Sequence, residues 1–143
     1  MRRLSLALTA IGIACGFAAA SASSLAATTD FDGRWAVTAT CPKDPGGALG
    51  YTLRFPAEVR NGVLHGQYGE AGKPASLTLT GTIAPDGTAH FDADGITGHE
   101  QYNLKQTPRN VRYAYHVSAK FAGKSGSGSR DEGRVCRYSF VKE

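Results

Sequence analysis

The sequence has few charged residues and, after residue 30, no long apolar run. Charged side chains make up 20% of the 143 residues, whereas 41% of the residues are hydrophobic. A disordered chain would usually be more charged and less apolar, so the composition predicts a folded core. Because no apolar run after residue 30 reaches the length of a membrane-spanning helix, an integral helical membrane protein is excluded.

The motifs that mark catalytic and metal sites are also missing. The four histidines do not have metal-ligand spacing, and no cysteine pair lies near them. Serine, histidine and aspartate occur without a nucleophile elbow. Gly123-Lys124-Ser125 resembles the end of a phosphate-binding loop, but Ser118 stands where that motif needs its first glycine. We therefore expect no enzymatic activity, no cofactor and no metal ion.

One acidic stretch has the spacing of a calcium loop. His90, Asp92 and Asp94 alternate like calcium ligands, but the first of them is not an acid, and Gln101 replaces the glutamate that should end the loop. The same alternation places the three residues on the wet face of a strand. There they would face basic side chains of a neighbouring strand in a cross-strand charge ladder. The candidate partners are Arg112, His116 and Lys120.

Residues 1–26 have the features of a secretory signal peptide. A pair of arginines opens the segment, residues 4–20 are apolar and rich in alanine, and the small residues that follow offer cleavage after Ala22 or Ala26. No N-glycosylation sequon occurs. We expect cleavage to leave one domain, residues 27–143, in a bacterial periplasm or secreted from the cell.

Three cysteines occur, and one of them lies in the signal segment. A lipid-attachment site at Cys15 would need a bulky aliphatic residue where Gly12 stands. Cys41 and Cys136 remain, and in an oxidising compartment an even pair most simply forms a disulfide. That bridge would close a loop of about 95 residues and stabilise the fold by roughly 4–5 kcal/mol on the chain-entropy model.

After residue 30, hydrophobic and polar residues alternate over eight short segments separated by turn signals, of which Asn61-Gly62 is the strongest. Pro56 lacks an N–H, so we expect a bulge or a gap in the ladder there. Residues 95–111 show no clear period, and 102–104 is their one candidate for a short strand. The strands that we expect are 34–41, 51–60, 63–69, 76–84, 88–94, 112–121, 124–130 and 134–142.

Sequential antiparallel hairpins form either a sandwich or an up-and-down barrel. Cys41 ends the first expected strand and Cys136 lies near the start of the last, both on inward-patterned faces. A bridge between them requires these two strands to be neighbours, as they are in a closed barrel, which also removes exposed edges. We therefore predict an all-β, antiparallel up-and-down barrel of about eight strands, closed by this disulfide.

The first strand opens with Gly33-Arg34-Trp35, and the last carries Arg134 and Arg137. This pattern resembles that of the calycins, which include the lipocalins and avidins. In them Gly-x-Trp begins the first strand, and a basic residue of the final strand covers the tryptophan ring. The resemblance implies a structural Trp35 at the closed end of a barrel. The chain is also similar to small exported proteins of unknown function in Gram-negative bacteria, which implies a fold and no activity.

The barrel interior is the remaining candidate site. An eight-stranded barrel either fills with side chains or holds one small ligand. Small inward residues either make room for rings or leave a pocket, and the pattern leaves both open. In a pocket, tyrosine hydroxyls would be the polar anchors. The inward aromatic residues that we take as candidate ligand contacts are Tyr51, Phe55, Tyr68, Tyr113, Tyr115 and Tyr138.

Charge is unevenly distributed along the chain. Residues 28–100 carry a net charge of −4, and residues 101–143 carry +6. The basic residues of the second half form a positive wall if they share one face, and leave no net patch if the acids of residues 90–94 pair with them. The candidates for this wall are Arg112, Lys120, Lys124, Arg134 and Arg137.

These features favour an exported, monomeric, non-enzymatic binding protein with no nucleic-acid partner and no integral membrane segment. It either holds a small apolar or aromatic ligand in the barrel, or has a solid core and acts through loops such as residues 42–50. In the second case it would dock to another envelope protein or inhibit it. A cavity above about 300 Å³ favours the first function. A filled barrel with an exposed apolar loop patch favours the second.

Overall fold

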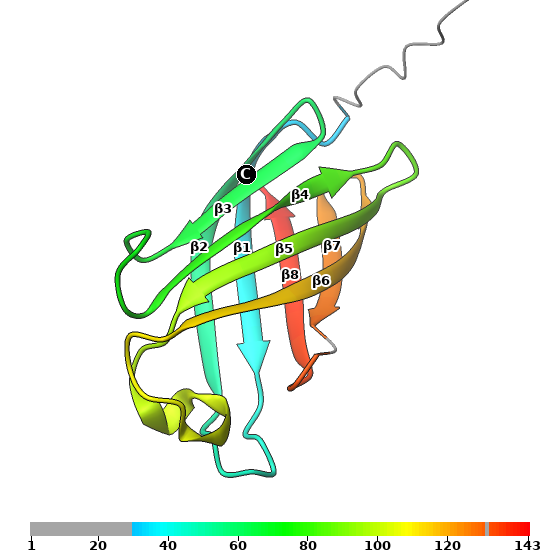
Figure 1. Cartoon of the computed structure of the whole chain (residues 1–143). Coiled ribbons are helices and arrows are strands. Elements are labelled where there is room, and N and C mark those ends of the chain that lie inside the picture. Colours follow the sequence, from blue (N-terminus) through cyan, green and yellow to red (C-terminus); the bar gives the residue numbers. More distant parts are fainter. Residues whose placement is uncertain (1–29, 131) are drawn as a thin grey trace, which may run out of the picture.

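The structure, a computed structural model, describes residues 30–130 and 132–143. Eight strands follow one another and close into an antiparallel barrel in which β1 also pairs with β8 (Figure 1). The predicted barrel is therefore confirmed, whereas the predicted signal segment lies outside the described residues. The strands are β1 (Gly33–Cys41), β2 (Tyr51–Arg60), β3 (Val63–Tyr68), β4 (Ser76–Ile83), β5 (Thr88–Ile96), β6 (Arg112–Ala122), β7 (Ser125–Arg130) and β8 (Cys136–Lys142).

The long connection between β5 and β6 contains two 3₁₀ helices, η1 (Glu100–Tyr102) and η2 (Leu104–Gln106). The expectation of a short strand at 102–104 is therefore wrong. Asn103 explains why, since its side-chain amide donates to the carbonyl oxygens of Gly98 at 3.3 Å and Thr107 at 2.7 Å. The connection is held by local hydrogen bonds and by a backbone hydrogen bond from the Leu49 N–H to the carbonyl oxygen of Gln101 at 2.7 Å, and no strand of the described residues pairs with it. Within the described part of the chain, no helix is long and apolar enough to cross a membrane.

Pro56 produces no bulge. The register between β1 and β2 runs one to one through Pro56, which lies opposite Ala36. On the other side of β2, the pairing with β3 ends at Ala57, one residue before Pro56 is reached. Pro56 is therefore unpaired on that side, which is the predicted gap in the ladder.

One end of the barrel is filled by aromatic rings. Trp35, Phe91, Phe121 and Phe140 are fully buried. The Phe121 ring lies 5.1 Å from the Trp35 ring and 4.9 Å from the Phe140 ring, centroid to centroid. The indole N–H of Trp35 donates to the carbonyl oxygen of Phe31 at 2.8 Å, so the buried ring leaves no unpaired donor. We call this end, which also holds the C-terminus, the closed end (Figure 1).

Glycines make room for these rings. A Cβ atom at Gly126 of β7 would lie 2.9 Å from the Phe121 ring, and one at Gly81 of β4 would lie 2.8 Å from the Phe91 ring. Both distances are shorter than ordinary van der Waals contact. The inward glycines of β7 therefore follow from packing, because a larger side chain at Gly126 would displace the Phe121 ring and a Cβ atom at Gly128 would meet Ala119 and the carbonyl oxygen of Ser118.

The basic residue beside the Trp35 ring is Lys142. Its Nζ lies 6.0 Å from the ring centroid, and the two residues are opposite each other in the β1–β8 register. Arg137 is exposed and pairs with Thr40, because its position alternates with the inward ones, and Arg134 lies at the other end of the barrel. The expectation that Arg134 or Arg137 covers the tryptophan is therefore wrong.

The disulfide between Cys41 and Cys136 joins the end of β1 to the start of β8, with the two Cα atoms 4.3 Å apart. Both residues are buried, and this prediction is confirmed. The bridge lies at the end opposite Trp35, which we call the open end. Figure 1 shows the 42–50 loop, η1 and η2 gathered there. The disulfide thus fixes the strand seam directly beneath the loops that surround the candidate site.

Candidate functional site

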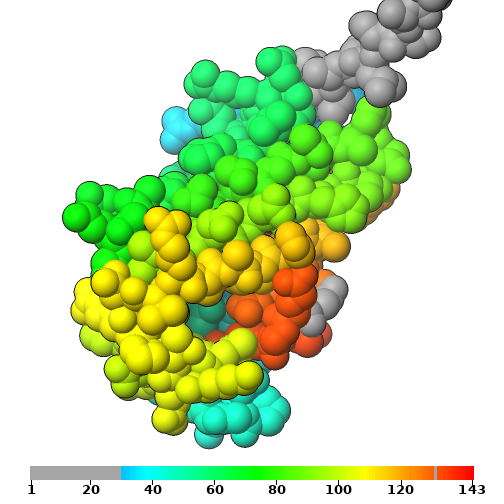
Figure 2. Space-filling view, in the orientation of Figure 1, coloured from blue at the N-terminus to red at the C-terminus, as the bar shows by residue number. Residues whose placement is uncertain are grey.

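The open end contains a cavity of about 580 Å³. Its wall is formed by inward residues of β2, β3 and β6, by the segment 96–107, and by residues just before β8. Figure 2 shows the hollow between the segment around residues 100–112 and the start of β8, with β2 visible at its back. The barrel is therefore solid at one end and hollow at the other.

Four tyrosines line this cavity: Tyr51 of β2, Tyr68 of β3, Tyr102 of η1 and Tyr113 of β6. The Tyr51 and Tyr102 rings meet edge to face at 6.3 Å. The Tyr113 hydroxyl donates to the carbonyl oxygen of Ser76 at 3.3 Å. Within residues 30–130 and 132–143, the hydroxyls of the other three have no hydrogen-bond partner. These hydroxyls are free to bind a ligand that the rings enclose.

Two further tyrosines lie deeper. Tyr115 and Tyr138 are buried, and their hydroxyl oxygens are 2.6 Å apart. One hydroxyl donates to the other, and the second proton has no acceptor among the residues that the structure describes. Burial raises the pKa of Tyr115 far above its usual value, and it raises that of Tyr138 to about 12, although the hydrogen bond to Tyr115 acts in the opposite direction. Both therefore stay neutral phenols at physiological pH.

The six predicted contact residues thus occupy two levels. Tyr51, Tyr68 and Tyr113 line the cavity, whereas Tyr115 and Tyr138 lie deeper in the core. Phe55 is also buried in the core, where its ring lies 6.4 Å from that of Tyr68. It is therefore a packing residue of the core beneath the wall.

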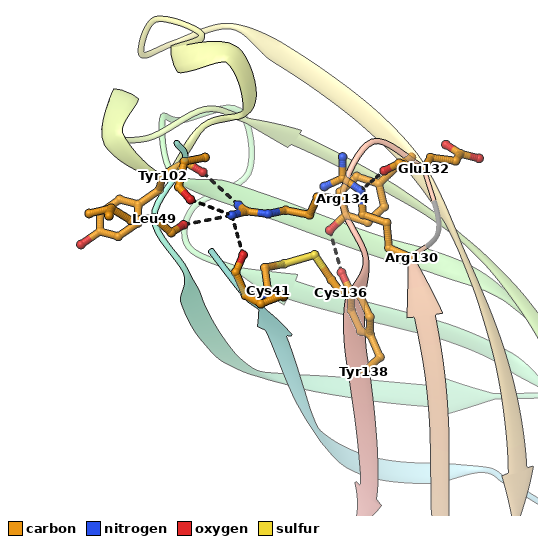
Figure 3. The surroundings of a disulfide bond; sticks show 11 residues. Cys41, Leu49, Tyr102, Arg130, Glu132, Arg134, Cys136 and Tyr138 are labelled. Atoms are coloured by element: carbon orange, nitrogen blue, oxygen red, sulfur yellow. Dashed lines mark hydrogen bonds between the residues drawn. A yellow bond between two sulfur atoms is a disulfide. The ribbon is translucent and has the colours of Figure 1, made fainter. Parts of the chain in front are cut away.

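Arg134 is a cavity residue that sequence analysis placed on a surface wall. Arg134 is only 5% exposed, and its side chain extends from just before β8 across the open end, over the disulfide (Figure 3). One terminal nitrogen donates to the carbonyl oxygen of Tyr102 at 3.1 Å, and the other donates to those of Pro42 at 2.8 Å and Leu49 at 3.0 Å. Arg134 thereby ties the 42–50 loop to η1. Arg134 is therefore not part of the predicted positive wall on the barrel surface.

The signal for an inward Arg134 was present in the sequence. It has the same parity as Cys136, Tyr138 and Phe140, the inward residues of β8. A charged side chain ordinarily faces water, which favours the surface wall, but the alternation is the better guide at this position. Tyr102 was missed for a different reason, since it lies in the segment without a clear period.

Two more arginines line the cavity. The guanidinium carbon of Arg130 lies 3.9 Å from the centroid of the Tyr115 ring, and its Nε donates to the carbonyl oxygen of Glu132 at 2.7 Å. Arg112 begins β6 at the rim. Of the described residues that line the cavity, none is an aspartate or a glutamate. The cavity is therefore aromatic and positively charged.

The acidic stretch of β5 lies on the outer face of the barrel. Asp92 is opposite His116, and its Oδ1 lies 2.8 Å from the Nδ1 of His116. His90 and Asp94 are opposite uncharged residues, so one pair of the expected charge ladder forms. No group of three His, Cys, Asp or Glu residues within the described ranges is arranged to hold a metal ion.

Comparisons of the chain with models of protein families, with curated proteins and with solved structures found no match. The eight-stranded antiparallel barrel is compatible with a calycin-like fold.

Proposed function

We propose that the protein is a non-enzymatic binding protein that holds one small aromatic or apolar molecule in the cavity at the open end. The observation that carries this proposal is an aromatic cavity of about 580 Å³ that opens to the surface. Small-molecule sites are typically concave, mostly apolar and about 300–1,000 Å³ in volume, with a few polar groups that orient the ligand. The tyrosine hydroxyls and arginines of this cavity would supply those groups.

The solid closed end supports a preformed site. Because Trp35, Phe121 and Phe140 fill that end, ligand binding would not need the strands to rearrange. A preformed cavity avoids the free-energy cost of ordering loops when the ligand binds. The ligand would pack its rings against the faces and edges of the tyrosines, which favour offset and edge-to-face contacts.

We also propose that the protein acts outside the cytoplasm and belongs with the calycin-like barrels. The Cys41–Cys136 disulfide supports an oxidising compartment, because such bridges persist in the periplasm and in secreted proteins. Gly33 and Trp35 at the start of β1, with Lys142 beside the tryptophan ring, support the calycin relationship. Residues 1–26 would be the export signal.

Filling the cavity tests the proposed function. Leu53 lines it, whereas the next residue of β2, Arg54, is exposed on the outer face. With phenylnaphthylamine, an uncharged fluorescent aromatic probe, we expect wild type and Arg54→Trp to bind alike. We expect Leu53→Trp to bind at least about tenfold more weakly, the equivalent of about 1.4 kcal/mol. Titration by probe fluorescence measures this, and thermal unfolding checks that both variants fold.

Two results would contradict the cavity. One is a wild-type protein that binds neither the probe nor any co-purified small molecule when it is isolated from its own cell envelope and weighed by native mass spectrometry. The other is a folded Leu53→Trp variant that binds the probe as wild type does.

A second candidate function is docking to another envelope protein through the loops of the open end. It is favoured by the exposure of large apolar side chains at or beside the rim, namely 41% for Leu49, 40% for Val111 and 60% for Val135. If docking is the function, native mass spectrometry detects an added mass of protein size. That mass disappears in the double variant Leu49→Asp with Val135→Asp, whereas probe binding in the cavity persists.

A further inference from the structure

The cavity combines aromatic walls with uncompensated positive charge. We propose that its ligand is an organic anion, an aromatic or apolar molecule with one acidic group, and that Arg130 and Arg134 bind that group. This inference rests on the proposed function, because it names the ligand class of the same cavity. A volume of about 580 Å³ limits the occupant to one small molecule rather than a macromolecule.

Arg134 is a buried charge without a charged partner among the described residues. Removing a charged group from water is costly unless the charge is paired, and Arg134 is nearly fully buried. Its terminal nitrogens donate only to neutral carbonyl oxygens, and its Nε has no partner among the described residues. The carbonyl dipoles compensate the charge only in part. A nearby anion would complete the compensation at low local dielectric, where charge–charge interactions are strongest.

No described acidic residue acts as a counter-ion to the arginines of the cavity. Ion pairs between residues that the structure describes involve Arg34, Arg60 and His116, all on exposed side chains. None involves an arginine of the cavity, and no described acid lines its wall. The positive charge of the cavity is therefore not cancelled from within these ranges.

Arg130 supplies a group that can hold the anion. Its guanidinium lies over the Tyr115 ring, which fixes the plane of the group by a cation–π contact. Only its Nε donates to a described acceptor, the carbonyl oxygen of Glu132. The terminal nitrogens keep the flat, two-pronged geometry that binds a carboxylate or sulfonate through two parallel hydrogen bonds.

The rest of the cavity fits the body of such a ligand. Leu53, Ile96 and Leu104 contribute apolar surface, and the tyrosine rings that line the wall add aromatic faces. An amphipathic molecule would place its acidic group toward the arginines and its rings against these side chains. A neutral aromatic molecule would use the same walls but leave the arginine charge unpaired.

The test compares two fluorescent probes that differ by one charge: anilinonaphthalene sulfonate, an anion, and phenylnaphthylamine, its uncharged parent. Both are titrated into wild type, Arg130→Gln, Arg134→Gln and the outer-face control Arg137→Gln. A charged hydrogen bond contributes about 1.5–3 kcal/mol, so wild type should bind the anion about ten- to a hundredfold more tightly than the parent. Arg130→Gln should remove most of that preference without weakening the parent. Arg137→Gln should behave as wild type.

The remaining outcomes separate this inference from the function on which it rests. Equal affinity of wild type for the two probes, or an anion preference that survives Arg130→Gln, overturns the anion site but not the proposed binding of a small molecule in the cavity. Binding of neither probe, together with the absence of any co-purified small molecule, overturns the proposed function itself. Because Arg134 also anchors the 42–50 loop, Arg134→Gln is interpreted only with a thermal unfolding curve, and Arg130→Gln decides the result.

Discussion

The two ends of the barrel share eight strands and one inward-outward alternation, but they differ in the aromatic residues that point inward. The closed end holds tryptophan and phenylalanine, whose rings pack against one another. Four of the six tyrosines line the open-end cavity; of the other two, Tyr115 stacks on Tyr113 of the wall, and Tyr138 is hydrogen-bonded to Tyr115. A phenolic ring packs like phenylalanine and adds a hydrogen-bonding group. The two ends thus differ in how their rings are satisfied: the closed end is packed ring against ring, whereas the tyrosines of the open end either pair their hydroxyls in the core, as Tyr115 and Tyr138 do, or line the cavity.

The largest effect should follow removal of the disulfide. Replacing both Cys41 and Cys136 by alanine releases a loop of 95 residues and should lower the free energy of unfolding by roughly 4–5 kcal/mol. Urea denaturation measures the loss. The open end should suffer most, since hydrogen exchange should rise first in the 42–50 loop beside Cys41. A loss below about 1 kcal/mol would mean that pairing of β1 with β8 holds the seam without the bridge.

At the closed end, Trp35→Ala should lower the free energy of unfolding by about 3–5 kcal/mol, because it leaves a cavity among packed rings and removes a buried hydrogen-bond donor. Probe affinity in the folded fraction should not change. If instead stability changed by less than about 1 kcal/mol while probe binding was lost, Trp35 would be a binding residue and the division between the ends would fail.

The deep tyrosines should make the protein sensitive to alkali. Burial raises the pKa of Tyr113, Tyr115 and Tyr138 in the folded state, to about 12 for Tyr138. Above about pH 10, the unfolded chain releases phenol protons that the folded chain retains. Stability is therefore fully present below about pH 10 and falls as pH rises toward the folded pKa values.

Urea denaturation at about pH 8 and about pH 11 measures this slope. Tyr138→Phe should make the slope shallower, since one strongly shifted phenol is gone, at the cost of the hydrogen bond to Tyr115. Tyr102→Phe is the matched control at the cavity rim. A slope that is the same in wild type and Tyr138→Phe would contradict the burial of this hydroxyl.

The smallest effect should come from the outer wall. Asp92 and His116 form a close pair, but their side chains are 68% and 72% exposed, so solvent screens the interaction. Asp92→Asn should change the free energy of unfolding by less than about 1 kcal/mol and leave probe affinity unchanged. A larger loss in low salt that disappears at high salt would indicate a stronger charge network on this wall.

The alternation of residues was enough to predict the barrel, because each strand buries one face and the cysteine pair requires the first and last strands to meet. Strand β2 was predicted with its observed bounds. The connection from 97 to 111 was not predictable in this way. Its hydrogen bonds are made by Asn103, by local carbonyl groups and by two residues far away in the chain, Leu49 and Arg134, so no hydrophobic period marks them.

The cavity was only partly predictable. The alternation of hydrophobic and polar residues identified Tyr51, Tyr68 and Tyr113 as inward. It gives no information on where the inward rings fill the barrel and where they leave space. That outcome depends on which residues oppose each other across the interior. The contacts of Arg134 depend on carbonyl groups about 90 residues away in the chain, at Pro42 and Leu49, and no local pattern encodes such contacts.

The central claim is that the open end binds a small ligand and the closed end does not. NMR spectra of the aromatic side chains during titration with phenylnaphthylamine test it most directly. We predict saturable shifts of the ring signals of Tyr51, Tyr68, Tyr102 and Tyr113, with the indole signal of Trp35 unchanged. Saturable shifts of the Trp35 indole without shifts of these tyrosines, or no saturable shift at all, would contradict the account.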